Sequence, residues 1–318
     1  MFATRFFSRA LALAALAVGS AGLAACGGSM GNANSALPIS GESVAYKADV
    51  SGPVHIRTLP NPLDALQAAT AKPVTYHGGP IIPASVTYAI FWQPTGTFMS
   101  AKYQPVIEQF LQDVGNTPQY NILTQYTDTA GPILNQSSLG GAWVDTSPYP
   151  ANFNRGGTGD TDLHNEVLKA IAANNWPKGG LQPVYIILTA SKGPDDSWAA
   201  CAYHSNFLHS GTQYIYAIVP YQHDYGAHGC GTPSNVWPND RDADQTIDTM
   251  WHEIAESVSD PLGNAWLRNG SEIGDLCQTS YGPLASDGSD VTDHGHDYVT
   301  QEIWSNFGLQ CVQTQASR

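Results

Sequence analysis

The sequence predicts a mixed α/β domain of the α+β class, in which a twisted sheet packs on helices. The run of β-branched and aromatic residues over 85–92 is typical of a buried strand. Apolar residues three or four apart predict a helix over 100–114 and a second helix that carries Leu163, Val167 and Ile171. The two kinds of segment follow one another without an internal repeat, which favours one layered domain.

Turn residues and changes of period place the remaining elements. Asp160 or Thr161 is expected to begin the second helix, and Asn174-Asn175 with Pro177 to end it. The polar run after Leu188 is expected to be a loop. The expected order is strand 85–92, helix 100–114, short strands 121–126 and 141–144, the helix from Asp160 or Thr161 to Asn174-Asn175, strands 183–188 and 214–219, and helix 242–259.

The N-terminus has the pattern of an export signal. Arg5 and Arg9 precede an uncharged run that ends near residue 25, and its apolar part is too short to span a bilayer. The run closes with Leu23-Ala24-Ala25-Cys26, which resembles the lipobox of bacterial lipoproteins, where the cysteine after the cleavage site is lipidated. A simple cleaved signal with an incidental cysteine is the alternative. We therefore expect an exported lipoprotein of the periplasm, outer membrane or cell surface.

Composition divides the chain into three parts. Residues 1–25 form the expected signal peptide, and residues 26–73 are small, polar and aperiodic, as in a flexible tether. Residues 74–318 then form a single globular domain. No later run is long and apolar enough to predict a membrane span.

Charge narrows the class of partner. Removing 1–25 takes away two arginines and no acid, which leaves 11 basic against 27 acidic residues, a formal charge of −16. Such a surface repels nucleic acids and anionic membranes. We expect a peptide or cell-envelope substrate, no nucleic acid, and membrane contact through the lipid anchor alone.

Four further cysteines predict two disulfides, because the chain is exported and their number is even. Three pairings exist, and we favour Cys201–Cys230 with Cys277–Cys311 because each joins cysteines close in sequence. A structural zinc site is the rival, but no pair has the Cys-x-x-Cys spacing.

The strongest chemical signal is Trp251-His252-Glu253-Ile254-Ala255-Glu256. His252 and Glu256 are one helical turn apart and share a face, beside a buried apolar stripe. The pattern matches the zinc-protease motif except that Glu256 replaces the second histidine. Glu253 then occupies the position of the general base. These features predict a zincin-like domain, although α/β sandwiches of other connectivity fit the same element order.

A zinc site needs a third protein ligand, and the acidic segment after the helix supplies candidates. We expect Glu272 to be the ligand and Asp275 to orient His252 from behind, with Asp260 as a further candidate. Asp260 precedes Pro261, so it is equally suited to accept backbone N–H groups where the helix ends. One histidine and two carboxylates make an oxygen-rich site, so zinc is the first choice, with manganese or calcium as alternatives. A surface helix with solvated His and Glu is the opposing interpretation.

The other histidines have plainer interpretations. His204, His209 and the segment 221–228 are expected in loops beside the first disulfide, as hydrogen-bonded residues, with a substrate-facing role for His204 or His228 left open. His294 and His296 are more distant ligand candidates, in an acidic run over 286–297. That run lacks the EF-hand order, so a solvated turn is favoured over a calcium loop.

Several segments together resemble the phosphate-induced, exordium-like family of secreted proteins. They are Tyr76-His77-Gly78-Gly79-Pro80, the Cys201 and Cys230 region, Asp260-Pro261-Leu262-Gly263-Asn264-Ala265-Trp266, and Cys311, with 252–277 and 301–306 closer to bacterial relatives. The resemblance implies an extracellular role, which in plant members is growth signalling rather than catalysis. Plant members lack the His-Glu pair that this chain keeps.

Two functional hypotheses follow. The first is a lipid-anchored metallohydrolase, specifically a metallopeptidase, with His252 and Glu256 as ligands, Glu272 or Asp275 completing the site, and Glu253 as base. The second is a non-catalytic exordium-like envelope or secreted protein that binds carbohydrate or peptide. A serine or cysteine hydrolase has no usable nucleophile motif in this sequence.

Overall fold

The structure is a computed structural model that describes residues 50–51, 55–58, 72–151, 153, 160–191, 200–222, 230–233 and 235–317. The expected signal peptide, its lipobox with Cys26, and His228 lie outside these residues. The described residues all belong to one compact unit. No described helix is both long enough and apolar enough to cross a membrane.

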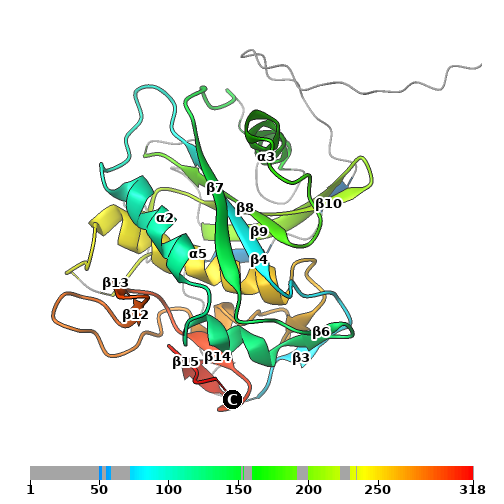
Figure 1. The fold of residues 1–318 in the computed structure, drawn as a ribbon, viewed down its shortest axis with the longest axis vertical. Coiled ribbons are helices and arrows are strands. Elements are labelled where there is room, and N and C mark those ends of the chain that lie inside the picture. Colours follow the sequence, from blue (N-terminus) through cyan, green and yellow to red (C-terminus); the bar gives the residue numbers. More distant parts are fainter. Residues whose placement is uncertain are drawn as a thin grey trace, which may run out of the picture. The chain divides into compact units, whose positions relative to one another are not determined.

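A seven-stranded mixed sheet is the centre of the fold (Figure 1). Its strand order is β1-β9-β10-β8-β4-β7, and β2 also pairs with β9. Strands β10, β8, β4 and β7 run parallel, whereas β9 is antiparallel to β10. The strands are β1 (Val50–Ser51), β2 (His55–Thr58), β4 (Ser85–Trp92), β7 (Ser137–Asp145), β8 (Pro183–Thr189), β9 (Ala200–His209) and β10 (Thr212–Val219).

Helices cover both faces of this sheet (Figure 1). Alternate residues of β4 point to opposite sides, as the two-residue period of a strand requires. Ile90 packs with the apolar face of α3 (Thr161–Asn174). Phe91 packs in the other core with α2 (Tyr103–Asp113) and α5 (Arg241–Ser259).

Short elements close the far side of α5. They are η1 (Tyr120–Gln125), η3 (Asp275–Cys277) and the pairs β3 (Thr75–Tyr76) with β11 (Trp266–Leu267), β5 (Thr127–Asp128) with β6 (Gly131–Pro132), β12 (Val291–Asp293) with β13 (His296–Tyr298), and β14 (Ile303–Ser305) with β15 (Gln310–Val312). Ile273, Leu276 and Trp304 from this layer belong to the same core as Trp251 of α5. Helix α5 is therefore buried on all sides, not only along the expected apolar stripe.

The mixed α/β class and the main helices agree with the sequence predictions, while two segments differ. Residues 121–126 were expected to be a strand, but all except Tyr126 lie in the 3₁₀ turn η1. This turn begins where the Thr117 hydroxyl accepts the Tyr120 N–H at 3.0 Å. The expected polar loop after Leu188 contains β9, a buried strand. Its polar residues, including His204, are paired within the interior, so the segment lacks the alternation that reveals most strands.

The region expected to be a tether also contributes to the sheet. Strands β1 and β2 lie within 26–73, and both pair with β9 in antiparallel register. Six residues of that range therefore extend the edge of the main sheet.

Two disulfides join the favoured cysteine pairs, Cys201–Cys230 and Cys277–Cys311. The first ties β9 to the segment that precedes α5. The second ties η3 to β15, which holds the acidic segment 272–275 against the C-terminal hairpin. Two disulfides of this kind are those of an exported protein.

Candidate metal centre

Helix α5 carries His252, Glu253 and Glu256 through the interior of the protein. Asp240 begins the helix by accepting two backbone N–H groups of its first turn. Pro261 follows its last turn and stops it, as the sequence predicts. The side chains of these three residues are at most 1% exposed. Other buried groups must therefore balance their charges and accept or donate their hydrogen bonds.

Gln301 sets the tautomer of His252. The Gln301 side-chain nitrogen donates to the Gly274 carbonyl at 3.0 Å, so its oxygen faces His252 Nδ1 at 3.1 Å and must accept a proton from it. In a neutral ring, Nε2 then carries a lone pair. That atom lies 3.1 Å from Glu256 Oε2 and 3.8 Å from Asp275 Oδ1. A lone pair facing two carboxylate oxygens is repulsive unless a proton or a cation lies between them.

Glu256 is held by the backbone of the acidic segment. Its Oε1 accepts the N–H groups of Gly274 and Asp275, each at 3.0 Å. The backbone approaches this closely because residue 274 has no side chain: a Cβ there would lie 2.7 Å from His252 Nδ1 and 2.9 Å from Glu256 Oε1. Glu256 Oε2 consequently remains directed toward the imidazoles.

His204 enters the same cluster from β9. Its Nδ1 lies 3.2 Å from Glu253 Oε2 and 3.7 Å from Glu256 Oε2, and its Nε2 lies 3.6 Å from Glu272 Oε1. Burial lowers the pKa of His204, although Glu256 and Asp260 oppose that shift. The ring is therefore neutral at pH 7, the form in which imidazole binds metals.

Carboxylates dominate the electrostatics of the cluster. Burial, and then the charge of Glu256, raise the pKa of Glu272 well above its ordinary value. Burial also raises the pKa of Asp260. Asp260 Oδ1 accepts two backbone N–H groups at 2.6 Å, from Asn264 and Ala265, whereas its buried Oδ2 has no hydrogen-bond partner among the residues that the structure describes. Such groups gain most from a bound cation.

Two groups of side chains have the donors and spacing to hold a metal ion. They are His204 with Glu256 and Glu272, and His252 with Glu256 and Asp275. Within each group the ligand atoms lie within 4.8 Å of one another. Tetrahedral zinc with ligands at about 2.0–2.1 Å needs ligand atoms separated by about 3.3 Å. The separations of 3.1–3.8 Å at His252 Nε2 are close to that value, so the residues fit such an ion with small adjustments.

The structure distributes the sequence-predicted residues differently from the expected single site. Asp275, expected behind His252, lies on the Nε2 side of the ring. Gln301 occupies the orienting position at Nδ1 instead. Glu272, expected as the ligand beside His252, has its contact with His204. Asp260 receives backbone donors, as one of its two expected roles requires.

Sequence reasoning missed His204 as a cluster member and did not consider Gln301 for the site. His204 was assigned to a loop, but it lies in β9 and is fully buried. The usable signal was its place in a run of buried aromatic and small residues beside Cys201, which is a strand signal despite its polar members. Gln301 follows the short β13 and has no motif of its own.

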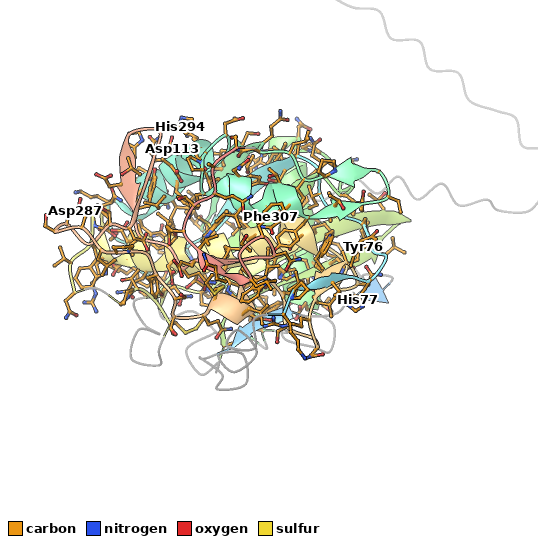
Figure 2. All side chains as sticks on the ribbon, turned by 90° about the horizontal axis from the view of Figure 1, so that it is seen from below. Tyr76, His77, Asp113, Asp287, His294 and Phe307 are labelled. Atoms are coloured by element: carbon orange, nitrogen blue, oxygen red, sulfur yellow. A yellow bond between two sulfur atoms is a disulfide. The ribbon has the colours of Figure 1, made fainter. Side chains whose placement is uncertain are left out.

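The two distal histidines lie elsewhere. His294 Nε2 is 3.0 Å from the Gly115 carbonyl, and His296 Nδ1 is 2.7 Å from Asp113 Oδ2. Figure 2 shows Asp113 and His294 together at one end of the view, with Tyr76 and His77 at the other. These contacts are those of a hairpin packed on the end of α2.

The two segments that most resemble exordium-like proteins lie against each other. Tyr76 pairs with Trp266 in the β3–β11 ribbon, and the Gly79 N–H donates to the Asn264 carbonyl at 2.8 Å. Gly79 is needed here because a Cβ would lie 1.9 Å from Asn264 Oδ1. Since Asp260 caps this same turn, the two segments secure the loop at the C-terminal end of α5.

Comparison with known proteins finds a distant homologue. The chain is 27% identical over 241 residues to Protein EXORDIUM-like 5 of Arabidopsis thaliana, a match that covers 65% of this chain. It spans 64% of the relative, just under two thirds of its length. No family profile matches the sequence, and no solved structure matches the fold. The distant relationship to an exordium-like protein agrees with the resemblance in the sequence.

Proposed function

We propose that the protein is an exported metal-dependent hydrolase whose ion is held in the α5 cluster. The observation that carries this proposal is the geometry at His252: its Nε2 faces Glu256 Oε2 at 3.1 Å and Asp275 Oδ1 at 3.8 Å, while Gln301 holds the proton on Nδ1. These three groups supply one nitrogen and two oxygens, the donor set that suits zinc or manganese.

Each residue of the chain has a definite task in this proposal. His252, Glu256 and Asp275 hold the ion, and Gln301 orients the imidazole. When bound, a zinc or manganese ion acidifies a water molecule and polarises a carbonyl group. Glu253 accepts the proton and holds it at its carboxylate, beside His204 Nδ1 at 3.2 Å. Asp275, whose side chain is 17% exposed, is more exposed to solvent than His252, which it contacts at 3.8 Å.

The fold and the N-terminus extend the proposal to substrate and location. A motif helix crossing beneath a mixed sheet supports a zincin-like arrangement, and with it a peptide as the substrate class (Figure 1). The lipobox-like sequence at Cys26 supports a lipid anchor at the cell envelope, and the acidic surface favours a cell-envelope or peptide substrate over nucleic acid.

The first test is metal content together with thermal stability. The purified chain, dialysed against trace-metal buffer, is expected to retain zinc or manganese by mass spectrometry, and a chelator is expected to lower its melting temperature. A chain that binds neither zinc nor manganese and does not respond to chelator would refute the metal centre.

The second test concerns chemistry. Glu253→Gln is expected to abolish hydrolysis of a peptide library while leaving bound metal unchanged. Glu108→Gln, at a half-buried position of α2 outside the cluster, is the control and is expected to change neither property. If Glu253→Gln loses its metal, Glu253 is a ligand rather than the proton acceptor.

A non-catalytic protein with a structural metal is the second candidate. It is favoured by burial, because His204, His252, Glu253, Glu256 and Glu272 are each at most 1% exposed, and structural sites are closed to solvent. The homology to an exordium-like protein supports the same candidate. Bound metal without hydrolysis of any peptide, ester or glycoside would select it.

A further inference from the structure

The two metal-binding groups share a single member, Glu256. His252 and Asp275 belong to one group, and His204 and Glu272 to the other. The five residues do not form one group of mutually close ligand atoms. One ion within about 2.1 Å of its ligands therefore cannot be bound by both histidines without rearrangement of buried side chains.

The position of Glu256 suits a bridge between two ions. Its Oε1 already accepts two backbone N–H groups of the acidic segment. Its Oε2 faces both imidazoles, at 3.1 Å from His252 Nε2 and 3.7 Å from His204 Nδ1. A carboxylate oxygen near two nitrogen ligands can act as a one-atom bridge, and paired ions in two-metal sites are about 3.5–4 Å apart. An inner ion that shares this oxygen would bind His204 through Nδ1, the ring nitrogen opposite the one that Glu272 Oε1 contacts. Glu272 would still be its third ligand, because one ligand atom from each of these residues lies within 4.8 Å of the others.

The buried charge points the same way. Five carboxylates, Glu253, Glu256, Asp260, Glu272 and Asp275, surround the two imidazoles, and four of the five are at most 1% exposed. One divalent ion offsets two carboxylate charges and two ions offset four, so a second ion allows more of these five carboxyl groups to ionise. Asp260 Oδ2, buried and without a hydrogen-bond partner in the described residues, is a further acceptor on a residue that interacts electrostatically with His204.

We propose that the cluster is a two-metal centre in which Glu256 Oε2 bridges an outer ion, held by His252 and Asp275, and an inner ion, held by His204 and Glu272. This inference rests on the proposed metal centre. Both ions are divalent first-row metals, with zinc first, because each position offers one nitrogen and two oxygens. In a hydrolase, two such ions clamp the attacking and the leaving oxygen.

The two positions differ in access. Asp275 is 17% exposed, whereas Glu272 and His204 are at most 1% exposed. We therefore expect a chelator to remove zinc in two phases of equal amplitude, the fast phase from the outer position. Asp275→Asn is expected to remove the fast phase and Glu272→Gln the slow one.

Stoichiometry decides the proposal. The full exported chain, stripped of metal and titrated with zinc alone, is expected to bind two ions. Asp275→Asn and Glu272→Gln are each expected to bind one, and Glu256→Gln is expected to lose more than half of the bound zinc because both positions use it. Glu302→Gln, an acid outside the cluster that bonds Ser280 Oγ at 2.6 Å, is the control and should bind two.

A spectroscopic readout separates lost binding from lost folding. With manganese as the probe, the wild-type chain is expected to show the exchange-coupled electron paramagnetic resonance spectrum of a bridged pair. Asp275→Asn and Glu272→Gln are each expected to show the six-line spectrum of an isolated ion. One ion per wild-type chain, without coupling, would overturn the two-metal proposal and leave the metal centre standing. No bound ion at all would refute the metal centre itself.

Discussion

Substituting Gly274 by alanine tests the cluster through its tightest contact. A new Cβ would lie 2.7 Å from His252 Nδ1 and 2.9 Å from Glu256 Oε1, whereas unstrained contacts between carbon and such atoms are about 3.5 Å. The backbone of Gly274 has an ordinary φ of −80°. Any destabilisation by alanine at this position therefore comes from steric overlap of the new Cβ and not from backbone strain. Either the acidic segment or the His252 ring must move by several tenths of an ångström.

The cost follows from what moves. Overpacking of a buried site costs about 1–3 kcal/mol, and displacement of the segment also weakens the hydrogen bond from the Gly274 N–H to Glu256. Disturbing the groups that orient metal ligands lowers metal affinity by about 10–100-fold. We therefore expect Gly274→Ala to lower the free energy of unfolding by about 1–3 kcal/mol. We also expect it to weaken zinc binding by about 10–100-fold.

Gly282 provides a matched control. A Cβ there meets Asp290 Cβ and Gln313 Cγ at 3.4 Å, which is ordinary contact, and alanine at a permitted φ changes stability by only about 0.4–1 kcal/mol. Denaturant unfolding with and without chelator, and calorimetric zinc titration, measure both quantities. If Gly274→Ala binds zinc as tightly as Gly282→Ala, the packing of residue 274 against the ligands has no role in metal binding.

Three further predictions concern groups around the cluster and at the far hairpin. Burial raises the pKa of Asp293 to about 7 from an ordinary 3.8, so the folded chain keeps a proton that the unfolded chain releases. The free energy of unfolding therefore falls by on the order of 4 kcal/mol as pH rises from about 4 to 7. Asp293→Asn should flatten this slope in melting curves at pH 4–8, whereas Asp287→Asn, at an exposed position, should not. Replacing Cys277 and Cys311 together by serine opens a loop with a sequence separation of 34. The free energy of unfolding in denaturant should fall by about 4 kcal/mol, and zinc binding should weaken. Unchanged zinc affinity would show that the disulfide does not position the acidic segment. Gln301→Leu removes the acceptor of the His252 Nδ1 proton. It should weaken zinc binding about 10–100-fold, with a smaller change in melting temperature than the disulfide variant shows. Zinc binding equal to that of the wild-type chain by calorimetry would contradict the assigned tautomer.

Local patterns were enough to predict much of the fold. The strand predicted over 85–92 and the helix predicted between Asp160 or Thr161 and Asn174-Asn175 correspond to β4 and α3, because each segment carries the period of its own secondary structure. Helix 242–259 was likewise predicted to within one residue, with Pro261 ending it. Strand β9 was not predicted, because its polar residues are buried by contacts with α5 that no local pattern reveals.

The site divides in the same way. The sequence by itself determined that His252 and Glu256 share a face, since helix geometry brings residues four apart together, and it favoured the two disulfide pairs. Tertiary structure alone decided which carboxylate meets which imidazole. It placed His204 beside Glu272, Asp275 at His252 Nε2, and Gln301 behind the ring. These distances depend on how β9 and the acidic segment dock against α5, and such long-range packing has no period in the sequence from which it can be read.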